Sequence, residues 1–166
     1  MARPSLHVST ICTGNICRSP MAEVVVKHLI AEDALLRDHV VVTSAGTAHW
    51  HVGSPMDPRA RGALHRAGFQ LPGSRAAYAD AAYLKRQDLV VVMTREHRHE
   101  VVGGLKPNAL VLLWRNLLEP GLDLDVPDPY FGDDQEFDEC LAIFRAAGPR
   151  LTSVLRQRWG EHSYEV

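Results

Sequence analysis

Residues 8–20, with the sequence VSTICTGNICRSP, change character twice and constrain the fold more than any other part of the chain. The apolar, β-branched run over residues 6–11 is typical of a buried strand. Ser19-Pro20 predicts a helix start, with the serine hydroxyl as N-cap and the proline at the first helical position. The polar residues 12–18 therefore form a loop between a strand end and a helix N-terminus.

A loop in this position is suited to binding an anion. Its backbone N–H groups can form an inward-facing nest, and the helix dipole adds to the attraction. The Arg18 guanidinium would hold a phosphate bidentately. We expect Gly14 to adopt a positive φ, and Asn15 to hold the loop by hydrogen bonds.

Cys12 opens this loop, where the N–H groups and the Arg18 cation would stabilise a thiolate nucleophile. The alternatives are that Cys12 is a small core residue or that the C-x5-R spacing arose by chance. The loop is not a Walker A motif, and Cys12 and Cys17 lack the C-x2-C spacing of a zinc site. The placement between a strand and a helix favours catalysis.

Three motifs together resemble one family across nearly the whole chain. They are CTGNICRSP at residues 12–20, TSAGT at 43–47 and DPYFG at 128–132. In this order and spacing they resemble the low-molecular-weight protein tyrosine phosphatases of bacterial type. The resemblance implies hydrolysis of phosphotyrosine and aryl phosphates through a phosphocysteine intermediate, with no cofactor and no metal.

The resemblance also implies roles for individual residues. Cys12 attacks phosphorus, Arg18 binds the phosphoryl oxygens, and Asp128 first protonates the leaving phenolate and then activates water. Without the resemblance, the sequence does not distinguish a catalytic Asp128 from an ordinary aspartate in an Asp-Pro turn. The predicted phosphate-binding residues are Thr13, Gly14, Asn15, Ile16, Cys17 and Arg18. Ser19 and Ser44 are predicted to support the loop, and Trp50, Tyr130 and Phe131 to form the substrate walls rather than ordinary packing.

The sequence departs from the family pattern at two positions. Ser74 stands where relatives often have His, so we expect the hydrogen-bond network around Asn15 to differ from that of the family. Thr94 stands where many relatives have Asp. Cys17 is either a small filler or, as the resemblance implies, the partner of Cys12 in a reversible regulatory disulfide. Cys140 is predicted to be a core residue.

The rest of the sequence predicts an α/β fold with a four-stranded parallel sheet and helices on both faces. The expected strands cover residues 6–11, 40–45, 89–93 and 109–113, and the expected helices 20–33, 58–67, 78–85, 94–102 and 134–159, with a break near Gly148-Pro149. Residues 114–133 form a long loop of the kind that often closes an active site. Asp57-Pro58 predicts a capped helix start, and Asp133 and Asp134 are expected to cap the last helix.

Composition limits the function classes. A chain of 166 residues predicts one domain over residues 1–166, and a net charge of −2 without basic runs argues against nucleic-acid binding. The sequence has no apolar run of the kind that predicts a membrane span or a signal peptide. Three cysteines, an odd number, favour a reducing cytoplasm, and export without a cleavable signal is left open. Only three of the 18 basic residues are lysines, which indicates a GC-rich, bacterial genome. We expect a monomer acting on tyrosine-phosphorylated proteins, with a cognate tyrosine kinase as a further partner.

Two rival functions stay open from the sequence. An arsenate reductase on the same scaffold would need a cysteine relay, and the chain has no cysteine between Cys17 and Cys140. A phosphotyrosine-binding module without turnover would have no need of both Cys12 and Asp128. Tyrosine phosphatases with a late nucleophile are disfavoured, because here the cysteine comes first and the acid last.

Overall fold

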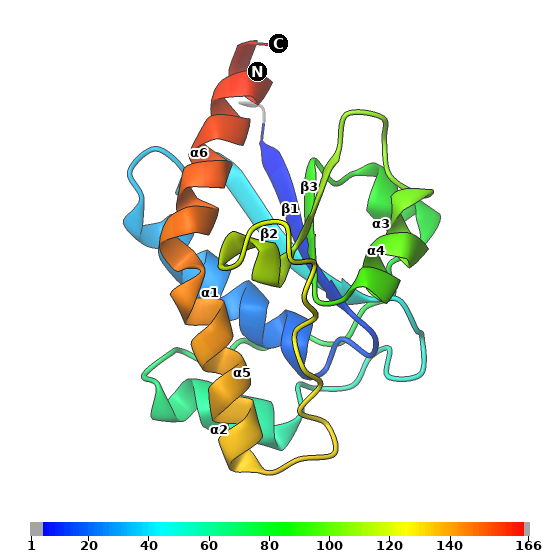
Figure 1. Cartoon of the computed structure of the whole chain (residues 1–166), viewed down its shortest axis with the longest axis vertical. Helices are drawn as coiled ribbons and strands as arrows, with labels where there is room; N and C mark the ends of the chain where they lie inside the picture. Colours follow the sequence, from blue (N-terminus) through cyan, green and yellow to red (C-terminus); the bar gives the residue numbers. More distant parts are fainter. Residues whose placement is uncertain (1–4, 165–166) are drawn as a thin grey trace.

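The centre of the fold is a sheet of four parallel strands in the order β2-β1-β3-β4 (Figure 1). The computed structural model describes residues 5–164. The strands are β1 (Leu6–Cys12), β2 (Val40–Gly46), β3 (Leu89–Val92) and β4 (Leu110–Leu113). The helices are α1 (Arg18–Glu32), α2 (Pro58–Arg66), α3 (Ala81–Lys85), α4 (Arg95–Val102), the short 3₁₀ helix η1 (Trp114–Leu117), α5 (Asp134–Ala146) and α6 (Gly148–Tyr164).

The hydrophobic strand sequences explain the parallel sheet. β3 is buried along its whole length and β1 at every position but one, as expected where helices cover both faces. β1 pairs with β2 in a register that sets Cys12 opposite Gly46. The carboxyl ends of β1, β2 and β3 therefore meet at one edge, where open α/β sheets bind their ligands.

Helices pack on both faces, which confirms the predicted fold class. Helices α1, α2, α5 and α6 lie on one side of the sheet, and α3 and α4 on the other (Figure 1). The larger core, under the first group, includes Trp114, Phe137 and Phe144, all fully buried. The smaller core lies under α3 and α4 and includes Ile11 and Val92.

The predicted caps at Asp57 and Asp133 are confirmed, and a third helix is capped by a residue that was not predicted as a cap. Asp57 caps α2 with a proline at the first helical position, and Thr94 caps α4. Asp133 forms a capping box with Glu136 at the start of α5. The side-chain oxygens of these caps accept hydrogen bonds from N–H groups of the first turn, which have no partner within the helix.

The start of α1 differs from the prediction. The helix begins at Arg18 instead of Pro20, and Cys17 occupies the N-cap position without a side-chain cap bond. Ser19 is therefore not the cap. A proline at the third helical position is tolerated, because the N–H groups of the first turn have no intrahelical partner.

Other boundaries also differ. The expected helix over 78–85 is limited to α3, since residue 78 pairs with Gly46 in an isolated bridge. The expected loop over 114–133 contains η1. The last helix is two helices, divided where the break near Gly148-Pro149 was expected.

The chain ends bear on two expectations. Residues 1–4, on which the expected lack of a signal peptide partly rests, lie outside the described residues, as do 165–166 at the other end of the predicted domain. Within the described part of the chain, no helix combines the length and apolar character that crossing a membrane requires.

Truncating a buried side chain should show how much the larger core contributes to the free energy of unfolding. Phe144 is fully buried and meets Trp114 edge-to-face at 4.9 Å, so Phe144→Ala should lower the free energy of unfolding by about 3–5 kcal/mol. Phe131 is 94% exposed, and Phe131→Ala should change it by less than about 0.5 kcal/mol. Urea denaturation of both variants is the measurement, and equal costs would contradict this account.

Candidate active site

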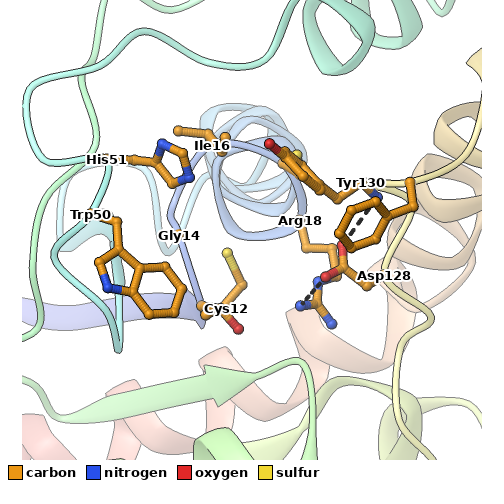
Figure 2. Close-up of a pocket in the computed structure, with 11 residues that line it drawn as sticks. Cys12, Gly14, Ile16, Arg18, Trp50, His51, Asp128 and Tyr130 are labelled. Atoms are coloured by element: carbon orange, nitrogen blue, oxygen red, sulfur yellow. Dashed lines mark hydrogen bonds and ion pairs between the residues drawn. The ribbon is translucent and has the colours of Figure 1, made fainter.

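A cavity of about 320 Å³ opens at the carboxyl edge of the sheet, around the loop that follows β1 (Figure 2). The residues that line it are Cys12, Thr13, Gly14, Ile16, Cys17, Arg18, Trp50, His51, Asp128, Tyr130 and Phe131. All of these except His51 were predicted from the sequence. The cavity brings the early loop and the late DPYFG motif together from distant parts of the chain.

The loop over residues 13–17 keeps its N–H groups free for a ligand. Carbonyl groups of the loop and of Cys12 just before it accept hydrogen bonds from neighbouring segments. Thr47 N–H donates to Cys12 O at 2.9 Å and Ala48 N–H to Thr13 O at 3.0 Å. Asp57 N–H donates to Ile16 O at 2.9 Å. Within residues 5–164, the N–H groups of residues 13–17 have no protein acceptor. Such a run of unpaired donors beside a helix N-terminus is an anion-binding nest.

Glycines at two points allow this close packing. A Cβ on Gly46 would lie 2.4 Å from Thr13 O, so β2 reaches the loop only because residue 46 has no side chain. A Cβ on Gly14 would lie 2.9 Å from the His51 ring. Gly14 does not have the positive φ that we expected from it; Asn15 adopts that conformation, with φ of 56°. Asn tolerates the left-handed region better than most residues.

Asn15 holds the loop through all of its amide groups. Its Nδ2 donates to Ser19 Oγ at 2.8 Å and to Ser44 Oγ at 2.9 Å, and its Oδ1 accepts from Ala77 N–H at 2.9 Å. Ser74, by contrast, is exposed. The amide is fully bonded through Ala77, without a histidine at position 74.

A buried carboxylate completes this network. Ser44 Oγ donates to Glu23, which is 5% exposed and also pairs with Lys27 one turn along α1. The lysine balances a charge that would otherwise be costly to bury. The sequence did not predict a role for Glu23 or Lys27 in this network, because each looks like an ordinary polar residue of a helix.

Cys12 lies at the end of this network. Its Sγ is 2.9 Å from Ser19 Oγ, and only 3% of the residue is exposed. Ser19 Oγ can thus donate to a Cys12 thiolate while it accepts from Asn15. The hydroxyl that the sequence suggested as a cap is instead bonded at the sulfur.

Cys17 is chemically different from Cys12. Burial, and then the negative charge of Asp57, raise the pKa of the Cys17 thiol well above its ordinary value. Burial likewise raises the pKa of Cys140 to about 12. Both thiols stay protonated at neutral pH, and Cys140 is a core residue as predicted.

Arg18 and Asp128 both line the cavity and form an ion pair there. Arg18 is buried, its Nη1 donates to Val126 O at 3.1 Å, and its Nη2 lies 3.3 Å from Asp128 Oδ2 (Figure 2). The Asp128 side chain is 49% exposed, so it reaches the cation from the solvent side. This contact places the predicted acid within reach of the predicted phosphate site.

Aromatic side chains border the cavity. Trp50 and Tyr130 lie on opposite sides of the Cys12 loop (Figure 2). Trp50 is 74% exposed and Phe131 94%, which excludes ordinary core packing for these two. Exposed aromatic faces beside an anion nest are suited to binding an aryl phosphate.

His97 contacts the loop from behind. Its Nε2 lies 2.8 Å from Thr13 Oγ1, and the residue is 2% exposed. Burial, assisted by the positive charge of Arg18, lowers the His97 pKa to about 4. The ring is therefore neutral at neutral pH and does not compete with Arg18 for an anion. No local pattern in the sequence predicts this role, because His97 lies within an ordinary helix.

The described residues contain no cluster of three or more His, Cys, Asp or Glu side chains able to hold a metal ion. The positive charge at the cavity comes from Arg18 and from the backbone donors of the loop.

His97 should make the fold sensitive to acid. Its pKa is about 4 in the folded protein against an ordinary 6.5, so the unfolded chain binds more protons between these values. Stability is therefore lost as pH falls through this window, by about 3 kcal/mol. Urea titrations at several pH values should show this loss in the wild type and a smaller one in His97→Gln. Parallel pH dependence of the two proteins would contradict the assignment.

Comparisons with known proteins agree with this geometry. Residues 7–159 match the family model described as low molecular weight phosphotyrosine protein phosphatase. The chain is 40% identical over 156 residues to low molecular weight protein-tyrosine phosphatase A of Mycobacterium tuberculosis, covering 92% of this chain and 93% of the relative. It is also 40% identical over 159 residues to a low molecular weight protein-tyrosine-phosphatase of Streptomyces coelicolor, covering 92% and 94%. A crystal structure of a protein tyrosine phosphatase from Entamoeba histolytica superimposes with a TM-score of 0.82 at 26% identity, covering 92% and 98% of the two chains. The predicted family is confirmed: this chain belongs to the low molecular weight phosphotyrosine protein phosphatases.

Proposed function

We propose that the chain hydrolyses phosphotyrosine in proteins, with Cys12 as nucleophile, Arg18 as phosphate ligand and Asp128 as general acid and base. One observation supports this most directly. A single cavity holds the Cys12 sulfur, the unpaired N–H groups of the loop and the Arg18–Asp128 pair at 3.3 Å. Family membership adds the reaction class.

In the first step the Cys12 thiolate attacks phosphorus, the S–P bond forms and the P–O bond to the phenolate breaks. The Asp128 carboxyl gives its proton to the departing oxygen. Arg18 and the loop N–H groups stabilise the charge on the equatorial phosphoryl oxygens. The hydroxyl of Ser19, 2.9 Å from the sulfur, stabilises the thiolate before attack and again when it leaves.

In the second step water attacks the phosphocysteine. The Asp128 carboxylate takes a proton from that water, the P–O bond forms and the S–P bond breaks. Phosphate and the Cys12 thiolate are the products, and Asp128 is left protonated. Asp128 is suited to both steps because its half-exposed side chain exchanges protons with solvent.

The aromatic border supports phosphotyrosine as the substrate. Trp50 and Tyr130 flank the cavity and can contact both faces of a phenyl ring, whereas a phosphoserine side chain is too short to reach between them. The proposal includes a cytoplasmic signalling role as a monomer, with a tyrosine kinase producing the substrates. Three unpaired, buried cysteines support the reducing compartment.

The thiols favour hydrolysis over arsenate reduction. A reductase relay needs a second and third reactive thiol. The burial that raises the pKa of Cys17 and of Cys140 keeps both thiols protonated at neutral pH. Only Cys12 combines a lining position with a hydroxyl partner.

Replacing the nucleophile should abolish turnover. Cys12→Ser should reduce kcat on p-nitrophenyl phosphate by at least about 10³-fold, because a hydroxyl is a far weaker nucleophile at neutral pH. Cys140→Ala, at a buried cysteine that does not line the cavity, should stay within about threefold of the wild type. A Cys12→Ser protein with normal turnover would exclude the proposed mechanism.

Removing the acid should hurt poor leaving groups most. Asp128→Asn should lower kcat/KM on phenyl phosphate by about 10²-fold or more, and less on p-nitrophenyl phosphate, whose phenolate leaves without a proton. The alkaline limb of the bell-shaped pH profile should disappear with it. Asp134→Asn, at an exposed position on α5, is the control. Equal losses on both substrates would argue against Asp128 as the acid.

A further inference from the structure

Arg59 connects the two loops that form the cavity without lining it. It lies in the first turn of α2 and its side chain is 31% exposed. Its guanidinium contacts groups on two sides, one connected to the phosphate-binding loop and one on the DPYFG segment. The family motifs that we recognised in the sequence do not include this residue.

On the first side, Arg59 forms a bidentate ion pair with Asp57. Its Nε donates to Asp57 Oδ1 at 3.0 Å and its Nη2 to Oδ2 at 2.8 Å. Hydrogen bonds from Arg59 lower the pKa of Asp57, so the pair stays ionised. The Asp57 N–H in turn donates to Ile16 O at 2.9 Å. The guanidinium is thus fixed relative to the phosphate-binding loop.

On the other side, Arg59 binds the segment that carries the acid. Its Nη1 donates to Gly132 O at 2.9 Å, and its guanidinium carbon lies 5.6 Å from the Tyr130 ring centroid and 4.7 Å from that of Phe137. Phe137 is a fully buried residue of α5, so one face of the guanidinium rests on the core. Its Nη1 group and its contact with the Tyr130 ring connect the guanidinium to residues 130–132.

Contacts within this segment connect Tyr130 to the acid. Tyr130 N–H donates to Asp128 Oδ1 at 3.2 Å, and Gly132 N–H donates to Pro129 O at 2.9 Å. The segment over residues 128–132 therefore forms a compact turn. Holding its end at Gly132 and its ring at Tyr130 also limits where the Asp128 carboxyl can lie.

We propose that Arg59 is a positioning residue: it fixes the turn over residues 128–132 above the phosphate-binding loop, so that Asp128 meets the leaving oxygen. It does not touch the phosphoryl group. This inference rests on the proposed function of Asp128. A lysine cannot replace Arg59, because a single ammonium cannot form a bidentate ion pair with Asp57 and also reach Gly132 O.

The test compares Arg59→Lys with Arg66→Lys. Arg66 lies on the same helix and also joins α2 to α5, through Asp138 at 2.7 Å, but at the exposed surface away from the cavity. Both substitutions keep the charge. Thermal unfolding of the two variants within a few degrees of each other establishes that both are folded.

Arg59→Lys should lower kcat/KM on phenyl phosphate by about tenfold to hundredfold, since small displacements of a catalytic group have effects of this size. The loss on p-nitrophenyl phosphate should be below about threefold, because that leaving group needs the acid least. The inhibition constant for vanadate should stay within about threefold, because the nest and Arg18 are unchanged. Arg66→Lys should leave all three values unchanged.

A double-mutant cycle then separates positioning from a general structural effect. In the Asp128→Asn background, Arg59→Lys should cost less than about twofold on phenyl phosphate, because the group that it positions is gone. Equal losses on the two substrates, additive losses in the cycle, or vanadate binding weakened more than tenfold would each overturn the inference. A wild-type protein inactive on both aryl phosphates would instead refute the proposed function, which separates the two failures.

Discussion

The hydrogen bonds that fix the carbonyl groups of the loop after β1 are the constraint on which the rest of the candidate site depends. The segment after β2 bonds Cys12 O and Thr13 O, and the start of α2 bonds Ile16 O. A peptide unit whose carbonyl is held outward presents its N–H on the other side, so these bonds preorganise the donors for an anion. Preorganised donors cost no reorganisation when charge develops in a transition state. The anion site is in this sense a product of the sheet register, which sets Cys12 beside Gly46.

A second layer of order comes from side chains. The bonds run from Glu23 through Ser44, Asn15 and Ser19 to the Cys12 sulfur, and each side chain before the sulfur has at least two partners. Buried polar networks rigidify a structure only when every member is satisfied. Here Lys27 supplies the counter-charge and Ala77 the last bond to the amide. The positive φ of Asn15 is tolerated because so many partners hold the residue in place.

The sequence predicted the elements well where one local signal was strong. The buried strands, the caps at Asp57 and Asp133 and the loop after β1 all follow from residue type and spacing. Ser19-Pro20 misled, because local propensity describes a cap equally well whether or not a sulfur lies nearby. The roles of Arg59 and His97 could not be found this way, since each depends on a partner more than 70 positions away along the chain, Gly132 for Arg59 and Thr13 for His97. Roles that arise from tertiary contacts leave no local pattern.

The ion pair between Arg18 and Asp128 has a consequence for turnover. The guanidinium that we propose as the phosphate ligand lies 3.3 Å from the carboxylate, so a bound oxyanion and the ionised Asp128 would repel each other in the site. In the proposed mechanism, inorganic phosphate released from the phosphocysteine shares the cavity with an aspartate that has just taken up a proton. When Asp128 loses that proton to solvent, the restored carboxylate competes for the cation and promotes expulsion of the product, and Asp128 takes up a proton from solvent again before the next substrate reacts. The same acidic group thereby links the chemical cycle to emptying of the cavity.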